Sequence, residues 1–105
     1  MFEIYLVDKE LDARRPLLVE MSRQEIQMYC EEHNKSCYLF SAAYVHNDMN
    51  MIRQYPVSVC VCAADFDEAK RFVLADYFSG EVYDGEAGIL IHDVVMLAAA
   101  TQTIV

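Results

Sequence analysis

Cys60 and Cys62 are separated by one residue, and two side chains at this spacing on a strand project from the same face. Such a pair could contribute to a zinc site, but most structural zinc ions take four protein ligands. The remaining candidate ligands stand in no recognised metal-binding spacing: Cys30, Cys37, His33, His46 and His92. No cysteine falls in the first turn of a predicted helix, where the helix dipole would activate a thiolate nucleophile. We therefore expect the thiols to be core side chains, without a metal or a cofactor.

Other catalytic patterns are equally weak. The three glycines, at positions 80, 85 and 88, leave little material for a phosphate-binding loop. Ser22 and Ser79 lack the Gly-x-Ser-x-Gly context of a hydrolase nucleophile. His92 and Asp93 are adjacent, and adjacent strand residues point to opposite faces, so they do not form a dyad together. We therefore predict a protein that is not an enzyme.

The distribution of charge is the most informative feature. The chain has 17 acidic and 8 basic residues, a net charge of -9, and no Lys or Arg beyond Arg71. Five carboxylates in this last third are the candidate partner-binding residues: Asp76, Glu81, Asp84, Glu86 and Asp93. The first four lie near one predicted turn, so we expect a local negative field. Direct binding to nucleic acid is disfavoured, because contacts to phosphates need clusters of Lys and Arg.

Two helices are predicted from their end signals. Ser22 and Glu25 have the spacing of a capping box, and Asn34 is a plausible stop because it tolerates the left-handed conformation. Asp65 begins a second helix in the same way, and Gly80 is placed to end it.

Strands are predicted over residues 2–7, 16–21, 37–45, 57–63 and 88–92, since these runs are rich in β-branched and aromatic residues. The first two suggest a hairpin, and residues 57–63 are apolar or small on both faces, as in a central strand. Residues 46–55 are expected to form a longer connection. Asp84-Gly85 is a hairpin-turn signal. Residues 93–105 fit either a helix or a strand.

These elements predict one α/β (α+β) domain over residues 1–105, with two helices packed on a mixed sheet of about five strands. A proline-led strand precedes each helix, over residues 16–34 and 56–80, which is compatible with a ferredoxin-like fold. Hydrophobic residues make up 55% of the chain, so we expect a homodimer. The apolar runs are shorter than the ~20 residues of a membrane span, and residues 1–5 lack a basic signal-peptide region, so we expect a cytoplasmic location.

Two hypotheses follow for function. The first is an acidic, non-enzymatic interaction module that binds a protein with a basic surface. In its most concrete form it is an inhibitor that imitates phosphate spacing and blocks a nucleic-acid-binding protein, by analogy of size and charge with phage-encoded inhibitors of host defence. The alternative is a small dimeric ligand-binding or enzymatic domain with a sheet-lined pocket, whose available polar groups are Tyr5, Tyr38, Tyr44 and His92.

Overall fold

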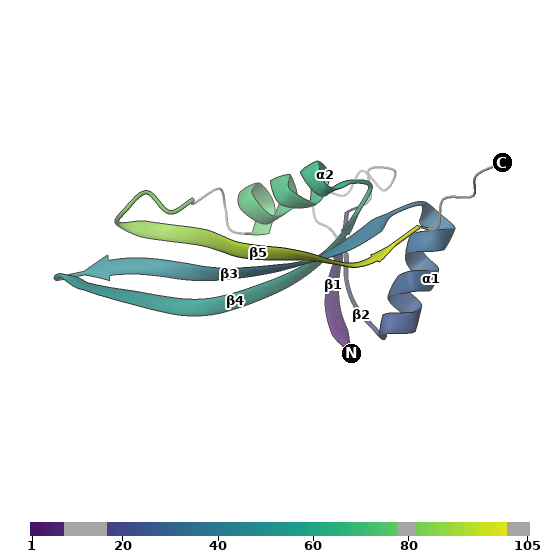
Figure 1. Ribbon diagram of the computed structural model, residues 1–105, viewed down its shortest axis with the longest axis horizontal. Coiled ribbons are helices and arrows are strands. Elements are labelled where there is room, and N and C mark those ends of the chain that lie inside the picture. The colour runs from purple at the N-terminus through teal and green to yellow at the C-terminus, as the bar shows by residue number, and fades with distance from the viewer. Residues whose placement is uncertain (8–16, 78–81, 101–105) are drawn as a thin grey trace.

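The protein forms a mixed five-stranded sheet with two helices, in the order β2-β1-β4-β3-β5 (Figure 1). The computed structural model describes residues 1–7, 17–77 and 82–100. The strands are β1 (Phe2–Leu6), β2 (Leu17–Met21), β3 (Ser36–Asp48), β4 (Met51–Ala63) and β5 (Ala87–Ala99). Among the five described strands, β1 and β4 pair in parallel and the other neighbours pair antiparallel. The predicted α+β class with about five strands and two helices is confirmed.

The order of the strands differs from the ferredoxin-like arrangement that the repeated strand–helix pattern suggested. In that arrangement the last strand would pair with the first. Here β2 folds back on β1 as the predicted hairpin and occupies that edge, so β5 pairs with the outer edge of β3. The strand before α1 is therefore an edge strand and the strand before α2 is central, so the two halves are not equivalent.

Helix α1 (Arg23–His33) begins and ends where its end signals predict. The Ser22 hydroxyl accepts a hydrogen bond from the Glu25 amide at 3.3 Å, and the Glu25 carboxylate accepts one from the Ser22 amide at 3.2 Å. Asn34 ends the helix with a left-handed φ of 52°. In the described residues, no helix has the length and the apolar run needed to cross a membrane.

Helix α2 (Phe66–Arg71) is also capped as predicted, because Asp65 Oδ1 accepts a hydrogen bond from the Glu68 amide at 2.8 Å. The buried Glu68 carboxylate accepts a second bond from the Ala64 amide at 2.9 Å. The chain then continues as a π-helical segment, η1 (Phe72–Tyr77). The predicted stop at Gly80 lies outside the described residues.

The two helices cover opposite faces of β4, which confirms its prediction as a central strand. Ile26 and Cys30 of α1 pack in one core cluster with Cys60 and Cys62. Ala69 of α2 and two residues of η1 pack in a second cluster with the alternate residues of β4, namely Val59, Val61 and Ala63. Because side chains alternate along a strand, the two clusters lie on opposite sides of the sheet.

Strands β3, β4 and β5 are each 13 residues long and extend as an arm beyond the helices, so the molecule measures 58 × 26 × 25 Å (Figure 1). The predicted long connection over residues 46–55 is wrong. Met49 and Asn50 both have positive φ, of 46° and 70°, and form a two-residue turn. This turn type matches the twist of paired strands, so pairing continues to Asp48 and Met51.

The sequence left residues 93–105 open between a helix and a strand. As far as Ala99 they belong to strand β5, and residues 101–105 lie outside the described residues. The strand has irregularities in its pairing with β3 between Cys37 and Tyr38 and between Ser41 and Ala42. Asp84-Gly85 does form a turn, but the bridge it leads into, between Val82 and Ile89, is parallel. The expected antiparallel hairpin is therefore not present at this turn.

Candidate protein-interaction surface

Asp84 and Glu86 lie together in the turn that precedes β5. The Asp84 carboxylate accepts hydrogen bonds from the Glu86 amide at 2.9 Å and from the Ala87 amide at 3.3 Å. These two bonds, the first being the stronger influence, lower the pKa of the Asp84 carboxyl below its ordinary value. Both carboxylates are exposed, and Asp84 is therefore an ionised group held in a defined position.

The turn is fastened to the end of the arm, because the Asn47 amide donates a hydrogen bond to the Glu86 carbonyl at 2.7 Å. Apolar side chains accompany the two carboxylates there. Met49 is 92% exposed, and Met51 and Ile52 are also largely exposed. We refer to Asp84, Glu86, Met49, Met51 and Ile52 as the arm end. The exposed methionines and the two carboxylates give this end of the arm both an adaptable apolar part and a negative part.

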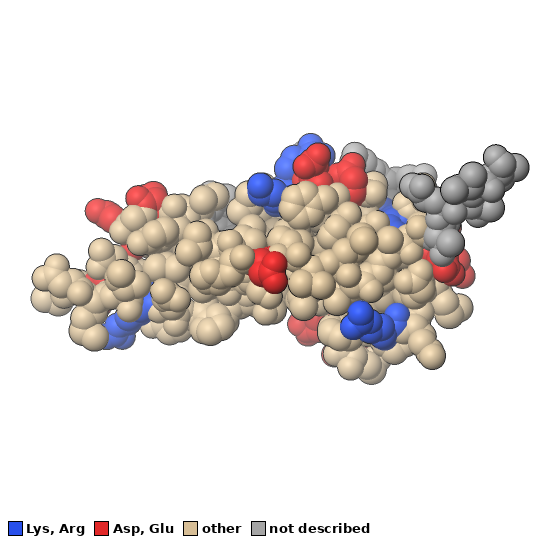
Figure 2. All heavy atoms as spheres, in the orientation of Figure 1, with Lys and Arg blue, Asp and Glu red and all other residues tan. Residues whose placement is uncertain are grey.

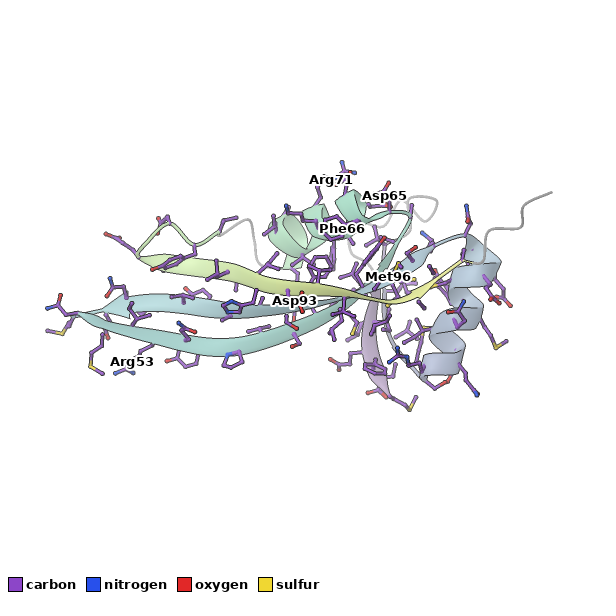
Figure 3. The ribbon with its side chains drawn as sticks, viewed as in Figure 1. Arg53, Asp65, Phe66, Arg71, Asp93 and Met96 are labelled. Carbon is purple, nitrogen blue, oxygen red and sulfur yellow. The ribbon has the colours of Figure 1, made fainter. Side chains whose placement is uncertain are left out.

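Asp93 is separate from the arm end. It lies midway along β5 (Figure 3), seven residues beyond Glu86, which corresponds to about 23 Å of strand. Its carboxylate is exposed and accepts a hydrogen bond from the Val94 amide at 2.9 Å. In Figure 2, seen from the same side, the surface around this carboxylate is almost free of charged atoms.

The five predicted carboxylates thus do not gather in one place. Asp84 and Glu86 are together and Asp93 is distant from them. Asp76 belongs to η1, but its side chain lies outside the described structure, as does the whole of Glu81. The sequence interpretation also missed a cation near the arm end. Arg53 of β4 lies in one cross-strand row with His46 and Ala87, and Figure 3 shows it toward the far end of the arm.

The polar groups of the pocket hypothesis are dispersed. The Tyr5 ring contacts Phe72 and Tyr77, with centroids 5.5 and 5.0 Å away, beneath η1. Tyr38 and Tyr44 both lie on β3, but six residues, or about 20 Å, separate them. The described structure therefore does not bring these tyrosines to one site. His92, the fourth group of that hypothesis, is exposed on β5.

The four cysteines are buried free thiols in the core beneath α1. The Cys30 and Cys62 sulfurs are 3.7 Å apart, and Cys37 is the cross-strand neighbour of Cys62. Burial, followed by the neighbouring Cys62, raises the pKa of the Cys30 thiol to about 12. The pKa of the Cys62 thiol is also raised, first by the hydrogen bond between Cys62 and Cys37 and then by burial. The Cys30 and Cys62 thiols are therefore protonated at neutral pH, and all four cysteines are small core side chains, as the sequence predicts.

The raised thiol pKa values predict a loss of stability in alkaline solution. Below pH 9, the ordinary thiol value, both folded and unfolded Cys30 are protonated. Between pH 9 and about 12 the unfolded thiol ionises first, so the free energy of unfolding falls by up to about 1.4 kcal/mol per pH unit for each such thiol. Urea denaturation over this range measures the slope. A Cys30→Ala variant should have a shallower slope, and an equal slope would assign the effect to other groups.

Comparison with known proteins adds no relative to this chain: no family model, curated protein or solved structure matches it. Within the described ranges, no group of three His, Cys, Asp or Glu side chains is arranged to hold a metal ion.

Proposed function

We propose that this chain is a cytoplasmic, non-enzymatic interaction module, and that its arm end binds a cationic surface of a partner protein. The observation that carries the proposal is the fixed, exposed and ionised Asp84 beside Glu86, at the end of an arm that extends beyond the helices. A charged group that is already ordered loses little conformational freedom when it meets its partner.

The apolar residues of the arm end support the same function. Met49, Met51 and Ile52 are exposed next to the carboxylates, and interface cores are enriched in methionine and other apolar side chains. The carboxylates would steer the partner toward the arm, and the apolar side chains would supply the buried contact area.

The specific form of the proposal is an inhibitor of a nucleic-acid-binding protein. A basic groove that binds phosphates also accepts carboxylates, and the arm consists of three paired strands about 4.8 Å apart, so it is narrow enough to lie along such a groove. Asp84 and Glu86 would occupy positions that nucleic-acid phosphates otherwise take. The inhibitor would then compete directly with the nucleic acid.

The test removes the two charges without removing the turn. In the double variant Asp84→Asn/Glu86→Gln, the amide oxygen of residue 84 can still accept the two backbone hydrogen bonds. We expect binding to the partner, captured from the native host and identified by mass spectrometry, to weaken by about tenfold. Binding of the unmodified protein should also weaken as salt concentration rises.

A matched control separates the site from the net charge. Glu20→Gln/Glu32→Gln changes the net charge by the same amount at two exposed positions on β2 and α1. The control should bind the partner like the unmodified protein. Equal loss in both double variants would show a non-specific charge effect, and no loss in the arm-end variant would overturn the proposal.

A further inference from the structure

The arm has two strand edges, and the β5 edge is already partly occupied. The Ile89 carbonyl, which faces away from β3, accepts a hydrogen bond from the Tyr83 amide at 3.1 Å. The Val94 amide donates to the Asp93 carboxylate at 2.9 Å, so a charged side chain blocks the edge there. Another strand would have to displace both of these bonds to pair with β5.

The β4 edge of the arm is open. Strand β1 pairs with β4 at residues 60–62, and the described part of the chain places only β3 beside residues 51–58 (Figure 1). Seven of these eight residues are exposed, the exception being the half-buried Val57. We refer to the backbone of residues 51–58 as the free β4 edge.

The even-numbered residues of β4 direct their backbone groups to this edge. The Cys62 carbonyl accepts a hydrogen bond from the Val7 amide at 2.9 Å on the β1 side, and the direction of the backbone groups alternates along a strand. Pro56 fits this parity, because its missing amide hydrogen then removes no bond to β3. The other even-numbered residues each present an amide and a carbonyl without a backbone partner among the described residues: Ile52, Gln54 and Ser58.

We propose that a second copy of this chain pairs with the free β4 edge, so that the two β4 strands run antiparallel and the two arms form one continuous sheet. A row of unpaired amides and carbonyls is completed by another extended strand. The two-fold axis passes through Gln54. Asn50 at the tip of one arm then lies opposite Ser58 of the other, just before the rows where β1 pairs with β4. This register therefore uses the whole free edge.

The backbone bonds follow from this register. The two Gln54 residues exchange both of their hydrogen bonds across the axis, and each Ile52 amide donates to the Pro56 carbonyl of the other copy. About four backbone hydrogen bonds thus join the copies. The Ile52 carbonyl gains none, because it lies opposite the proline nitrogen.

The side chains in this register are complementary. Arg53 of each copy lies opposite Tyr55 of the other in a pair without backbone hydrogen bonds, where cross-strand side chains are closest. Both are exposed, Tyr55 by 53%, so the guanidinium can lie against the tyrosine ring. On the other face, Ile52 lies opposite Pro56, an apolar pair. The second copy thus supplies a partner for the only charged side chain on the free β4 edge.

The neighbouring registers are less favourable. An axis through Arg53 would place the two Arg53 side chains directly opposite each other, and like charges in that position are destabilising. An axis through Tyr55 would bring Asn50 to the row of Cys60, where β1 already pairs with β4. Charge excludes the first of these registers, and space excludes the second.

The helices do not obstruct this arrangement. They cover the faces of the sheet at the base of each arm, whereas the copies meet edge to edge, with their bases at opposite ends of the paired arms (Figure 1). The Asp84 turn is fastened at the β5 edge and stays accessible, so dimerisation is independent of the function proposed for the arm end. Since few bonds join the copies, we expect a dimer that dissociates in the micromolar range.

A proline at position 54 tests the pairing, because the Gln54 amide faces the free edge and makes no bond to β3. We expect sedimentation velocity to show a monomer–dimer equilibrium for the unmodified protein. Gln54→Pro should raise the dissociation constant by at least about tenfold and leave the circular dichroism spectrum unchanged. Gln54→Ala keeps the amide and should dimerise like the unmodified protein.

An exchange of side chains tests the register. Tyr55→Arg should raise the dissociation constant by about tenfold, because it sets a second cation opposite Arg53. The double variant Arg53→Tyr/Tyr55→Arg restores the pair with its members exchanged and should dimerise again. Gln24→Arg adds the same charge at an exposed position on α1 and should have no effect.

Three outcomes would overturn the proposal. The first is a protein that stays monomeric throughout the micromolar range. The second is a dimer that Gln54→Pro does not weaken, because its interface then lies elsewhere. The third is a double variant that stays as weak as Tyr55→Arg alone, since residues 53 and 55 would then not face each other.

Discussion

Replacement of Phe40 by alanine should lower the free energy of unfolding by about 3–5 kcal/mol. Phe40 is the largest fully buried side chain in the described structure, with an exposed fraction of 0%. It lies on β3 in the core cluster beneath α2, where its ring stacks on that of Phe66 with centroids 6.1 Å apart. The substitution removes the ring and leaves a cavity, because β3 is held by its pairing with β4 and β5 and cannot move in to fill the space. Urea denaturation followed by circular dichroism measures the loss.

Phe66→Ala is the matched control for this prediction. It removes the same ring from the other half of the stacked pair, but Phe66 is 39% exposed at the start of α2. Solvent already reaches that position, so we expect a loss of only about 1–2 kcal/mol. Equal losses of stability in the two variants would contradict the prediction, because the two rings differ in burial and not in size.

Replacement of Gly88 by alanine should detach the turn that contains Asp84 and Glu86 from β5. Gly88 has a φ of +139°, which L residues rarely adopt, and an added Cβ would lie 2.6 Å from the Tyr83 nitrogen and 2.7 Å from its Cα. Both are backbone atoms and cannot rotate away. We expect a loss of about 3 kcal/mol, or release of the 82–86 segment. Faster exchange of the Tyr83 amide, which donates to the Ile89 carbonyl at 3.1 Å, would report that release.

Gly85→Ala separates the clash from the backbone strain. Gly85 also has a positive φ, of +105°, but an added Cβ there meets nothing within 4 Å. We expect a cost of about 1 kcal/mol and slow exchange of the Tyr83 amide. Similar results for the two glycines would show that the close approach at Gly88 does not hold the turn.

Local signals predicted the starts of both helices and the end of α1, because these positions depend on residues close in sequence. Ser22 and Glu25 satisfy each other's backbone groups within one turn, and Asp65 acts the same way on Glu68. The tip of the arm was not predictable in this way. Met49 takes a left-handed conformation for which methionine has no preference, and the long pairing of β3 with β4 imposes it.

The candidate site was predicted only in part for a related reason. Asp84 and Glu86 are two residues apart, so proximity in sequence was enough to place them together. Asp93 follows at a short sequence distance, but an extended strand covers about 3.3 Å per residue and carries it to the middle of the arm. Which edge β5 joins is decided by pairing with β3, and no local pattern carries that information.

The parallel pairing of β1 with β4 has a consequence for how the chain folds as it is synthesised. Ile4 pairs with Cys60, so the first strand cannot acquire its inner neighbour until more than half of the chain has left the ribosome. The β1–β2 hairpin can form early, with one edge still unpaired. Contacts so distant along the chain slow folding toward the millisecond-to-second range, and during that interval the nascent chain is most exposed to aggregation.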